Sequence, residues 1–289
     1  MRILILALSV SLGVGALAGG IREAAEARLG ALVAGDLDAL VGAYAPGAEA
    51  LFLGAPRSGF IAGDGLRAAW EGILAALHPV ELGVEDLTLV PEAGVAFARV
   101  SLGEGRWALW ALAFGPDGRV VGEDFLLYGL PGFPQPPVPD GAVGEGEYPH
   151  AAKAAGVEFY FLNGTVILFG ALRAPGTGWV AVGFDPDFRM QGADMVFAWV
   201  DDDGATVEDH YGSGPTSHRR DEISHILLAA GGEAEGVTTV EFVKPLSSGD
   251  PEDKPLERGK TYTVILAYHR SYDGFRRHTA RGRAEITLD

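Results

Sequence analysis

Two side chains in the second half of the chain have the chemistry of metal ligands. Met190 lies in a polar loop rather than on a periodic apolar face, and His278 lies in an arginine-rich segment near the end of the sequence. Taken alone, Met190 is typical of a gap-filling core residue and His278 of a hydrogen-bonded surface histidine. Taken together, a thioether and an imidazole are an axial ligand pair for a b-type haem. The pair therefore indicates a redox centre, provided that both side chains face one pocket.

Composition narrows this chemistry further. The chain of 289 residues contains no cysteine, which excludes a covalently attached haem, an iron–sulfur cluster, a disulfide and a thiol nucleophile. A haem would therefore be bound noncovalently. The formal net charge of −17 repels the phosphates of nucleic acids, so we expect no nucleic-acid partner.

Arginines gather around His278 in this otherwise acidic chain. Guanidinium groups bind carboxylates through paired hydrogen bonds, and a haem carries two propionates. Arg277 and Arg281 are therefore candidates to bind the propionates. An equally open interpretation is that these arginines are solvated residues that protect a strand edge.

Residues 1–18 have the pattern of a secretory signal. Arg2 provides the positive start, residues 3–14 are apolar, and Ala16 and Ala18 form a small-residue cleavage site. The apolar run is shorter than the roughly 20 residues that a spanning helix needs. We therefore expect a periplasmic or secreted protein that begins at Gly19 and has no membrane span after cleavage.

A segment rich in proline and glycine, residues 131–149, divides the rest of the chain. Before it, apolar spacing predicts helices that follow Gly19, Asp36 and Asp64, the second running through Tyr44, and then strands at 82–90, 95–102, 107–114 and 120–127. We expect an α+β domain over residues 20–130, with three helices on a curved antiparallel sheet.

This order of elements resembles the NTF2-like (SnoaL-like) cone. The turn AGDLDAL at 34–40 and the hairpin DGRV at 117–120 carry the resemblance. The family includes enzymes, ligand binders and dimerisation modules, so it implies no particular chemistry. We expect a pocket lined by Trp107 or Trp110 that could hold a small ligand; the candidate polar groups are His78, Arg106 and Asp124.

The second half, residues 150–289, shows only strand patterns and predicts a β-sandwich. Asn163-Gly164 between two apolar runs is a strong hairpin signal. Further strands are predicted at 179–184, 195–200, 206–211, 223–228, 237–243, 261–268 and 284–288.

Six motifs in this half resemble the ordered signature of a DOMON domain. They are GWVAVGF at 178–184, MQGAD at 190–194, WVD at 199–201, DHY at 209–211, FVKPL at 242–246 and HTARG at 278–282. The resemblance implies an immunoglobulin-like sandwich. In the haem b members of the family, a methionine and a late histidine hold the iron, and these positions correspond to Met190 and His278. Other DOMON domains are thought to bind sugars without this pair.

The leading hypothesis is therefore an exported electron-transfer protein with a noncovalent haem b and an unidentified redox partner, rather than an enzyme. Its NTF2-like module would bind a ligand or partner. Two alternatives stay open. A carbohydrate-binding module would use Trp179, Trp199 or Tyr211 as stacking surfaces. A periplasmic copper carrier would use Met190 and His278 together with His269 or His225.

Overall fold

The computed structural model describes residues 15–77 and 81–289. Two compact units divide the chain, one running up to Pro136 with the addition of Gly164–Val166, and the other comprising Pro137–Asn163 and Ile167–Asp289. His78 and most of the predicted signal lie outside the described residues, and the predicted cleavage point after Ala18 falls within helix α1 (Gly15–Ala34). Among the described residues, no helix is both long and apolar enough to cross a membrane.

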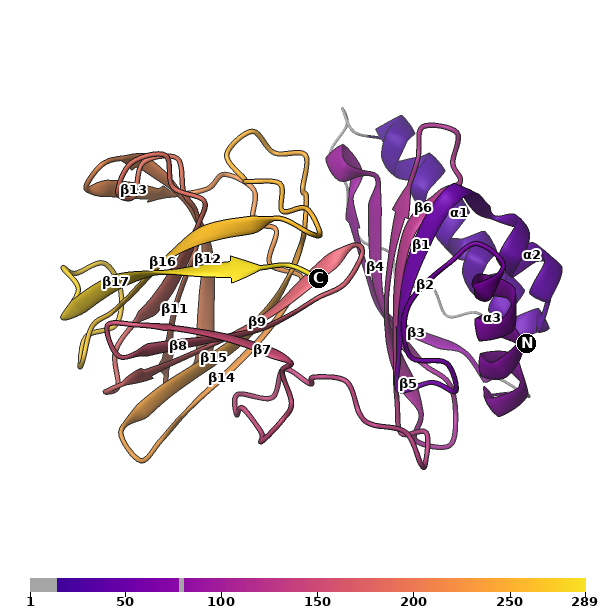
Figure 1. Cartoon of the computed structure of the whole chain (residues 1–289), viewed down its shortest axis with the longest axis horizontal. Coiled ribbons are helices and arrows are strands. Elements are labelled where there is room, and N and C mark those ends of the chain that lie inside the picture. The colour runs from indigo at the N-terminus through magenta and orange to yellow at the C-terminus, as the bar shows by residue number, and fades with distance from the viewer. Residues whose placement is uncertain (1–14, 78–80) are drawn as a thin grey trace. The chain divides into compact units, whose positions relative to one another are not determined.

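The first unit has an α+β fold, as the sequence predicted. Its three helices, α1, α2 and α3, lie on one face of a six-stranded sheet (Figure 1). The order of strands in the sheet is β2-β1-β6-β5-β4-β3. A 3₁₀ turn, η1 (Pro91–Ala93), joins β3 to β4. The bounds are α2 Leu37–Gly42, α3 Gly65–Leu77, β1 Tyr44–Leu53, β2 Gly59–Ala62, β3 Gly83–Val90, β4 Val95–Ser101, β5 Trp107–Phe114 and β6 Val120–Tyr128.

Two details of this unit differ from the prediction. The side chain of Asp36 accepts a hydrogen bond from Ala39 N at 2.9 Å and caps α2, but the helix ends at Gly42 and Tyr44 begins β1. The strand pair β1 and β2 was not predicted, because Pro46 and Gly47 interrupt its apolar alternation. The sheet is also mixed rather than antiparallel, since β1 pairs with β6 in parallel.

A buried ion pair lies at the centre of this unit. Arg28 donates to both carboxylate oxygens of Glu123, at 3.1 and 2.6 Å, and both side chains are almost fully buried. The same carboxylate accepts hydrogen bonds from Tyr44 Oη and, at 2.5 Å, from Trp110 Nε1. Four donors on one buried carboxylate compensate for its desolvation and connect α1 to strands β1, β5 and β6.

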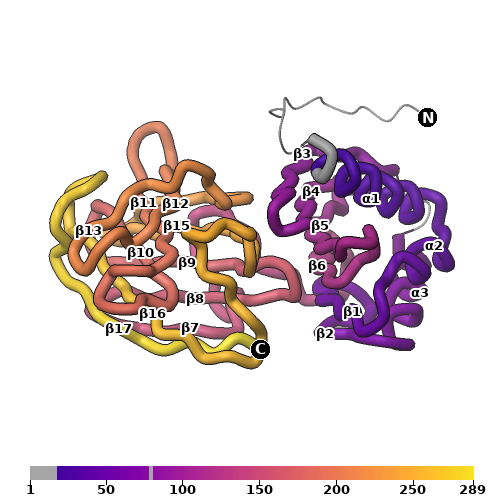
Figure 2. Tube along the Cα trace, turned by 90° about the horizontal axis from the view of Figure 1, so that it is seen from above, coloured from indigo at the N-terminus to yellow at the C-terminus, as the bar shows by residue number. Residues whose placement is uncertain are grey.

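The second unit contains only strands, in two sheets that share one core. The sheets have the orders β13-β12-β11-β10-β16-β17 and β14-β15-β9-β8-β7. Apolar side chains from both sheets pack together, among them Phe159, Val182 and Phe242. The edge strand β17 runs beside β16 (Figure 2). The bounds are β7 His150–Ala154, β8 Val157–Asn163, β9 Ile167–Pro175, β10 Val180–Phe184, β11 Asp194–Asp201, β12 Gly204–Gly214, β13 Ser217–Arg220, β14 Leu228–Ala234, β15 Val237–Pro245, β16 Thr261–Tyr268 and β17 Ala280–Thr287.

Most predicted strands of this unit are present, with two corrections. Residues 223–227 form no strand, and β14 begins only at Leu228, because the preceding segment turns the side chain of His225 into the interior. The connection from β8 to β9 comprises residues 164–166 rather than two residues. Asn163 is buried and exchanges two hydrogen bonds of 3.0 Å with the backbone of Asp289, so the one asparagine of the chain fastens the segment that follows β17.

The ion pair of the first unit predicts a large loss of stability on mutation. Glu123→Gln leaves the Arg28 charge buried without a counter-charge, and we expect the free energy of unfolding to fall by about 3–5 kcal/mol. The control is Arg67→Ala, which removes an exposed ion pair with Asp38 of 2.6 Å and should change the free energy of unfolding far less, because exposed ion pairs are screened by solvent. Denaturant unfolding measures both. Equal small losses would show that the Arg28–Glu123 pair contributes no more than a surface contact.

Candidate functional site

The two faces of strand β10 bury different sets of side chains. Val180, Val182 and Phe184 point into the core between the sheets. The alternate side chains lie on the other face, where Trp179 and Ala181 pack with Phe197 of β11 in a separate cluster. Both faces of this central strand therefore carry apolar side chains. Only segments outside the two packed sheets can cover the second face.

That second face forms the floor of a cavity of about 710 Å³. This volume is within the roughly 300–1,000 Å³ typical of sites for small molecules and cofactors. The lining combines sulfur, imidazole, aromatic and guanidinium groups with small residues that leave the space open. The lining residues include Trp179, Ala181, Gly183, Arg189, Met190, Met195, Phe197, His218, Phe275, Arg276, Arg277, His278, Arg281, Gly282 and Arg283. All four site residues that the sequence suggested, Met190, His278, Arg277 and Arg281, are among them.

Met190 reaches the cavity from a loop that is fastened to β12. Gly192 N donates to Gly212 O at 2.8 Å, and Gly212 N donates to Ala193 O at 2.8 Å. A side chain at position 212 would place its Cβ 1.7 Å from Met190 O, so the close approach requires glycine there. The motif around Met190 therefore has a structural reason: it holds the loop against the strand and the half-buried methionine beside the cavity.

His278 comes from the segment that joins β16 to β17. Two backbone hydrogen bonds fasten this segment to Trp179. His269 N donates to Trp179 O at 2.8 Å, and Trp179 N donates to Tyr272 O at 3.1 Å. A Cβ at position 178 would lie 2.5 Å from His269 O, which explains the glycine before Trp179. His278 follows just before β17 and is partly buried.

The cavity is cationic although the chain is acidic. Five arginines line it, and no acidic residue of the described part of the chain does. Partial burial lowers the pKa of His278, and the charges of Arg281 and Arg277 lower it further. The neutral imidazole, which has a lone pair available for a metal, is therefore the dominant form at pH 7.

A further histidine at the cavity was not predicted. His218 lines it, and its Nδ1 lies 3.1 Å from Nδ1 of His210, whose Nε2 lies 3.0 Å from a carboxylate oxygen of Glu208. Burial and His210 lower the pKa of His218. No motif along the chain identifies this group, because the pairing of β12 with β13 alone brings the two rings together.

The residues of the two alternative hypotheses are not gathered at the cavity. Trp179 lines it but is only 4% exposed and packs on Phe197 with ring centroids 4.6 Å apart, so it offers no open stacking surface. Trp199 and Tyr211 are not among the lining residues. His269 and His225 do not line it either, so of the copper set only Met190 and His278 come together.

In the first unit, the predicted polar groups have structural partners. Asp124 is fully buried and accepts hydrogen bonds from the amides of Thr165 and Val166 at 2.6 and 2.8 Å. Arg106 donates to Ala76 O at 3.2 Å near the end of α3. Trp107 stacks on Tyr128, with ring centroids 3.7 Å apart.

The cavity expected in this unit is nearly filled. Trp110 borders a space of only about 10 Å³, in which a single water fits. Aromatic packing of Trp70, Trp110 and Phe125, together with the Arg28–Glu123 pair, takes up the interior. Glu123 and Asp124 are both buried, but adjacent side chains of a strand point to opposite faces, so Glu123 is the acid that faces Arg28 in this interior.

Comparison with known proteins gives a family match in the second unit. Residues 155–269 match the model of the DOMON domain, a range that includes Met190 and ends before His278. One similar solved structure is the cytochrome b domain of pyranose dehydrogenase from Coprinopsis cinerea, at 10% identity and a TM-score of 0.35, covering 45% of this chain and 75% of that one.

Other similar solved structures are described as SnoaL-like or NTF-2 like proteins. They include a SnoaL-like protein of unknown function from Burkholderia thailandensis, at 24% identity and a TM-score of 0.33, covering 38% of this chain and 97% of that one. An NTF-2 like protein of unknown function from Burkholderia xenovorans has 27% identity and a TM-score of 0.29, covering 39% and 89%. The DOMON resemblance that the sequence indicated is confirmed for residues 155–269.

Proposed function

We propose that the second unit binds a noncovalent b-type haem, with Met190 and His278 as axial ligands, and transfers electrons. One observation carries the proposal: two potential iron ligands from distant parts of the chain line the same 710 Å³ cavity. A bound haem would supply reversible one-electron chemistry at that position.

The residues around the cavity fit such a group. The aromatic side chains of Trp179, Phe197 and Phe275 provide apolar walls, and the small residues Gly183 and Ala267 leave room between them. The buried indole N–H of Trp179 has no hydrogen-bond partner among the described residues, so an acceptor on a bound group would satisfy it.

Charge separates this proposal from the copper alternative. Five arginines at the cavity favour an anionic ligand, such as one that bears propionates, and oppose the entry of a free metal cation. We assign Arg277 and Arg281, which flank His278, to the carboxylates. If Met190 and His278 both held the iron, the protein would occupy positions that a substrate needs, which would favour outer-sphere electron transfer over oxygen chemistry.

For the first unit, we propose an NTF2-like module that binds the redox partner. The filled interior disfavours a small ligand, because the space beside Trp110 is about 10 Å³. We further propose that the second unit has the immunoglobulin-like arrangement of DOMON sandwiches and that the protein is exported.

The ligand assignment is tested by reconstitution with haemin and visible spectroscopy. We expect a Soret band in the wild type. His278→Ala should lose most of the haem, whereas Met190→Ala should retain haem with a changed spectrum and potential, because the sulfur bond is the weaker one. Met195→Leu and His218→Ala are the matched controls, since both residues line the cavity. A wild-type spectrum in both ligand variants, or its loss in a control variant alone, would contradict the assignment.

The arginines have their own test. Replacing Arg281 by glutamine should lower haemin affinity roughly tenfold, because a charge-assisted hydrogen bond contributes on the order of 1.5 kcal/mol or more. Arg173→Gln, on β9 and away from the cavity, is the control. Fluorescence quenching of tryptophan measures both affinities. If Arg281→Gln binds as tightly as the control variant, the arginine is a solvated residue at the strand edge.

Export predicts a shortened chain. Intact-mass measurement of the protein from its native host should give a mature form that begins at Gly19. A soluble product that still carries Met1 would argue against cleavage.

A further inference from the structure

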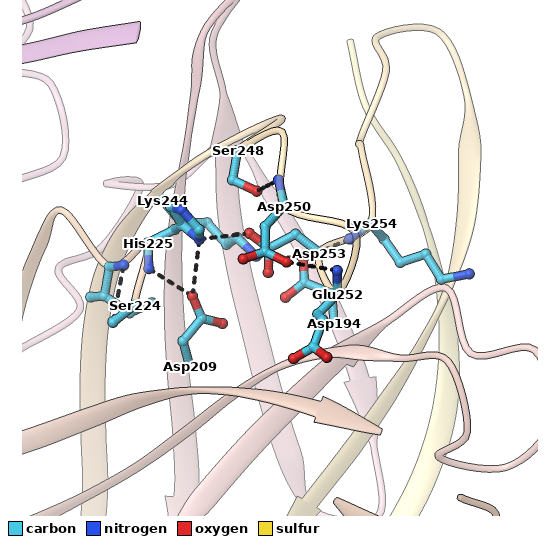
Figure 3. Close-up of polar contacts among 11 residues, drawn as sticks. Asp194, Asp209, Ser224, His225, Lys244, Ser248, Asp250, Glu252, Asp253 and Lys254 are labelled. Carbon is cyan, nitrogen blue, oxygen red and sulfur yellow. Dashed lines mark hydrogen bonds and ion pairs between the residues drawn. The ribbon is translucent and has the colours of Figure 1, made fainter. Parts of the chain in front are cut away.

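A second polar cluster lies on the inner side of strand β12, away from the cavity. Asp209 and His210 are neighbours on this strand, so their side chains point to opposite faces. His210 packs against Phe197 and Phe275 at the cavity. Asp209 points the other way, toward His225 and Asp253 (Figure 3).

Three potential metal ligands meet in this cluster, which we call the Asp209 cluster. Asp209, His225 and Asp253 are 1%, 4% and 8% exposed, and one ligand atom of each lies within 4.8 Å of the others. His225 Nδ1 is 3.0 Å from an oxygen of Asp253 and 3.9 Å from an oxygen of Asp209. The amide of His225 also donates to Asp209 at 2.8 Å, which holds the two segments in register.

Buried carboxylates outnumber buried ammonium groups in this cluster. Four carboxylates are buried here, those of Asp209, Asp253, Asp194 and Asp221, against one lysine, Lys244. Lys244 Nζ forms an ion pair with Asp194 Oδ2 at 2.5 Å. The ammonium group of Lys254 forms an ion pair with Asp187, outside the cluster. Asp250 and Glu252 lie on the segment that carries Asp253, and both are acidic (Figure 3).

The buried side chain of Asp221 is a second observation that points to a bound cation. Asp221 is 8% exposed, and neither of its carboxylate oxygens has a hydrogen-bond partner among the described residues. Oδ1 of Asp209 is likewise unpaired. Buried carboxylate oxygens without partners are costly unless a cation or a proton satisfies them, and a cation can satisfy several of them at once.

We propose that the Asp209 cluster is a binding site for a divalent transition-metal ion of the Zn²⁺ type, with Asp209, His225 and Asp253 as ligands and Asp221 as a further carboxylate beside them. A mixed set of imidazole and carboxylate suits zinc better than calcium, which takes oxygen ligands. Ligands about 2.0–2.2 Å from a tetrahedral ion lie roughly 3.3–3.6 Å apart, and the two measured separations, 3.0 and 3.9 Å, lie on either side of this range.

The ion would fasten three parts of the second unit together. Asp209 lies on β12, His225 lies in the connection 221–227, and Asp253 lies in the long connection 246–260 between β15 and β16. The chain has no cysteine, so no disulfide can close these connections. A metal that binds only the folded arrangement adds its binding free energy to folding. This site shares no residue with the proposed haem site.

The test is zinc binding by the full-length protein after treatment with EDTA. We expect one tightly bound Zn²⁺ by competition with a chromogenic chelator. Asp209→Asn and His225→Gln, which keep side-chain size, should each lower the affinity at least about 100-fold, beyond the 10–100-fold typical of residues that only support a ligand. Asp202→Asn, in an exposed acidic turn, is the matched control, and His278→Ala shows whether the cavity contributes. Both should bind zinc like the wild type.

Several outcomes would overturn the proposal. They are no zinc binding by the wild type, binding that depends on His278 instead of His225, and binding of Ca²⁺ alone that is unaffected by His225→Gln. If the ligand variants do not fold, hydrogen exchange of the wild type with and without Zn²⁺ replaces them. The amides of His225 and Asp253 should then exchange more slowly with zinc, and unchanged rates would contradict the site.

Discussion

The central strands of the second unit bury side chains on both faces, and the arrangement of that unit depends on this constraint. On β10, Val182 belongs to the core between the sheets, whereas Ala181 and Trp179 belong to the opposite face. An apolar sheet face must be covered, and here two loops that carry Met190 and His278 cover it incompletely. The space that remains is the cavity. The proposed site is thus a consequence of a sheet that is apolar on both sides, with glycines at 183 and 212 where side chains would fill the space or push the loop away.

Basic and acidic side chains lie on opposite faces of this sheet. The chain has an excess of acids, yet five arginines surround the cavity on the outer face of the sheet and four buried aspartates gather on its inner side. Adjacent residues of one strand, Asp209 and His210, belong to the two environments. In the first unit, the buried acid Glu123 is instead neutralised within the protein by Arg28. A fully compensated carboxylate is a structural feature, whereas uncompensated carboxylates and unopposed arginines point to ligands of opposite charge.

Much of the fold was predictable because local patterns agreed with the tertiary environment. The strand predicted at 261–268 is β16, and Asp36 caps α2 as expected. The failures have specific causes. Pro46 and Gly47 obscured β1, and residues 223–227 look like a strand but are held in an irregular course by the buried contacts of His225. Asp124 was named as a pocket group and Glu123 was not considered, because nothing in the local sequence tells which of two neighbouring carboxylates faces the helices.

By itself, the sequence determined the division into an α+β half and an all-β half, the absence of thiol chemistry, and the four residues named for the cavity, because hydrophobic periodicity, composition and family motifs are local properties of the chain. Only the tertiary structure decided what lies beside what. The pairing of β12 with β13 brings His218 to His210, and the connections 221–227 and 246–260 bring His225 and Asp253 to Asp209. These contacts join segments far apart in sequence, and the register of the strands and the path of the loops set them, so no local pattern records them.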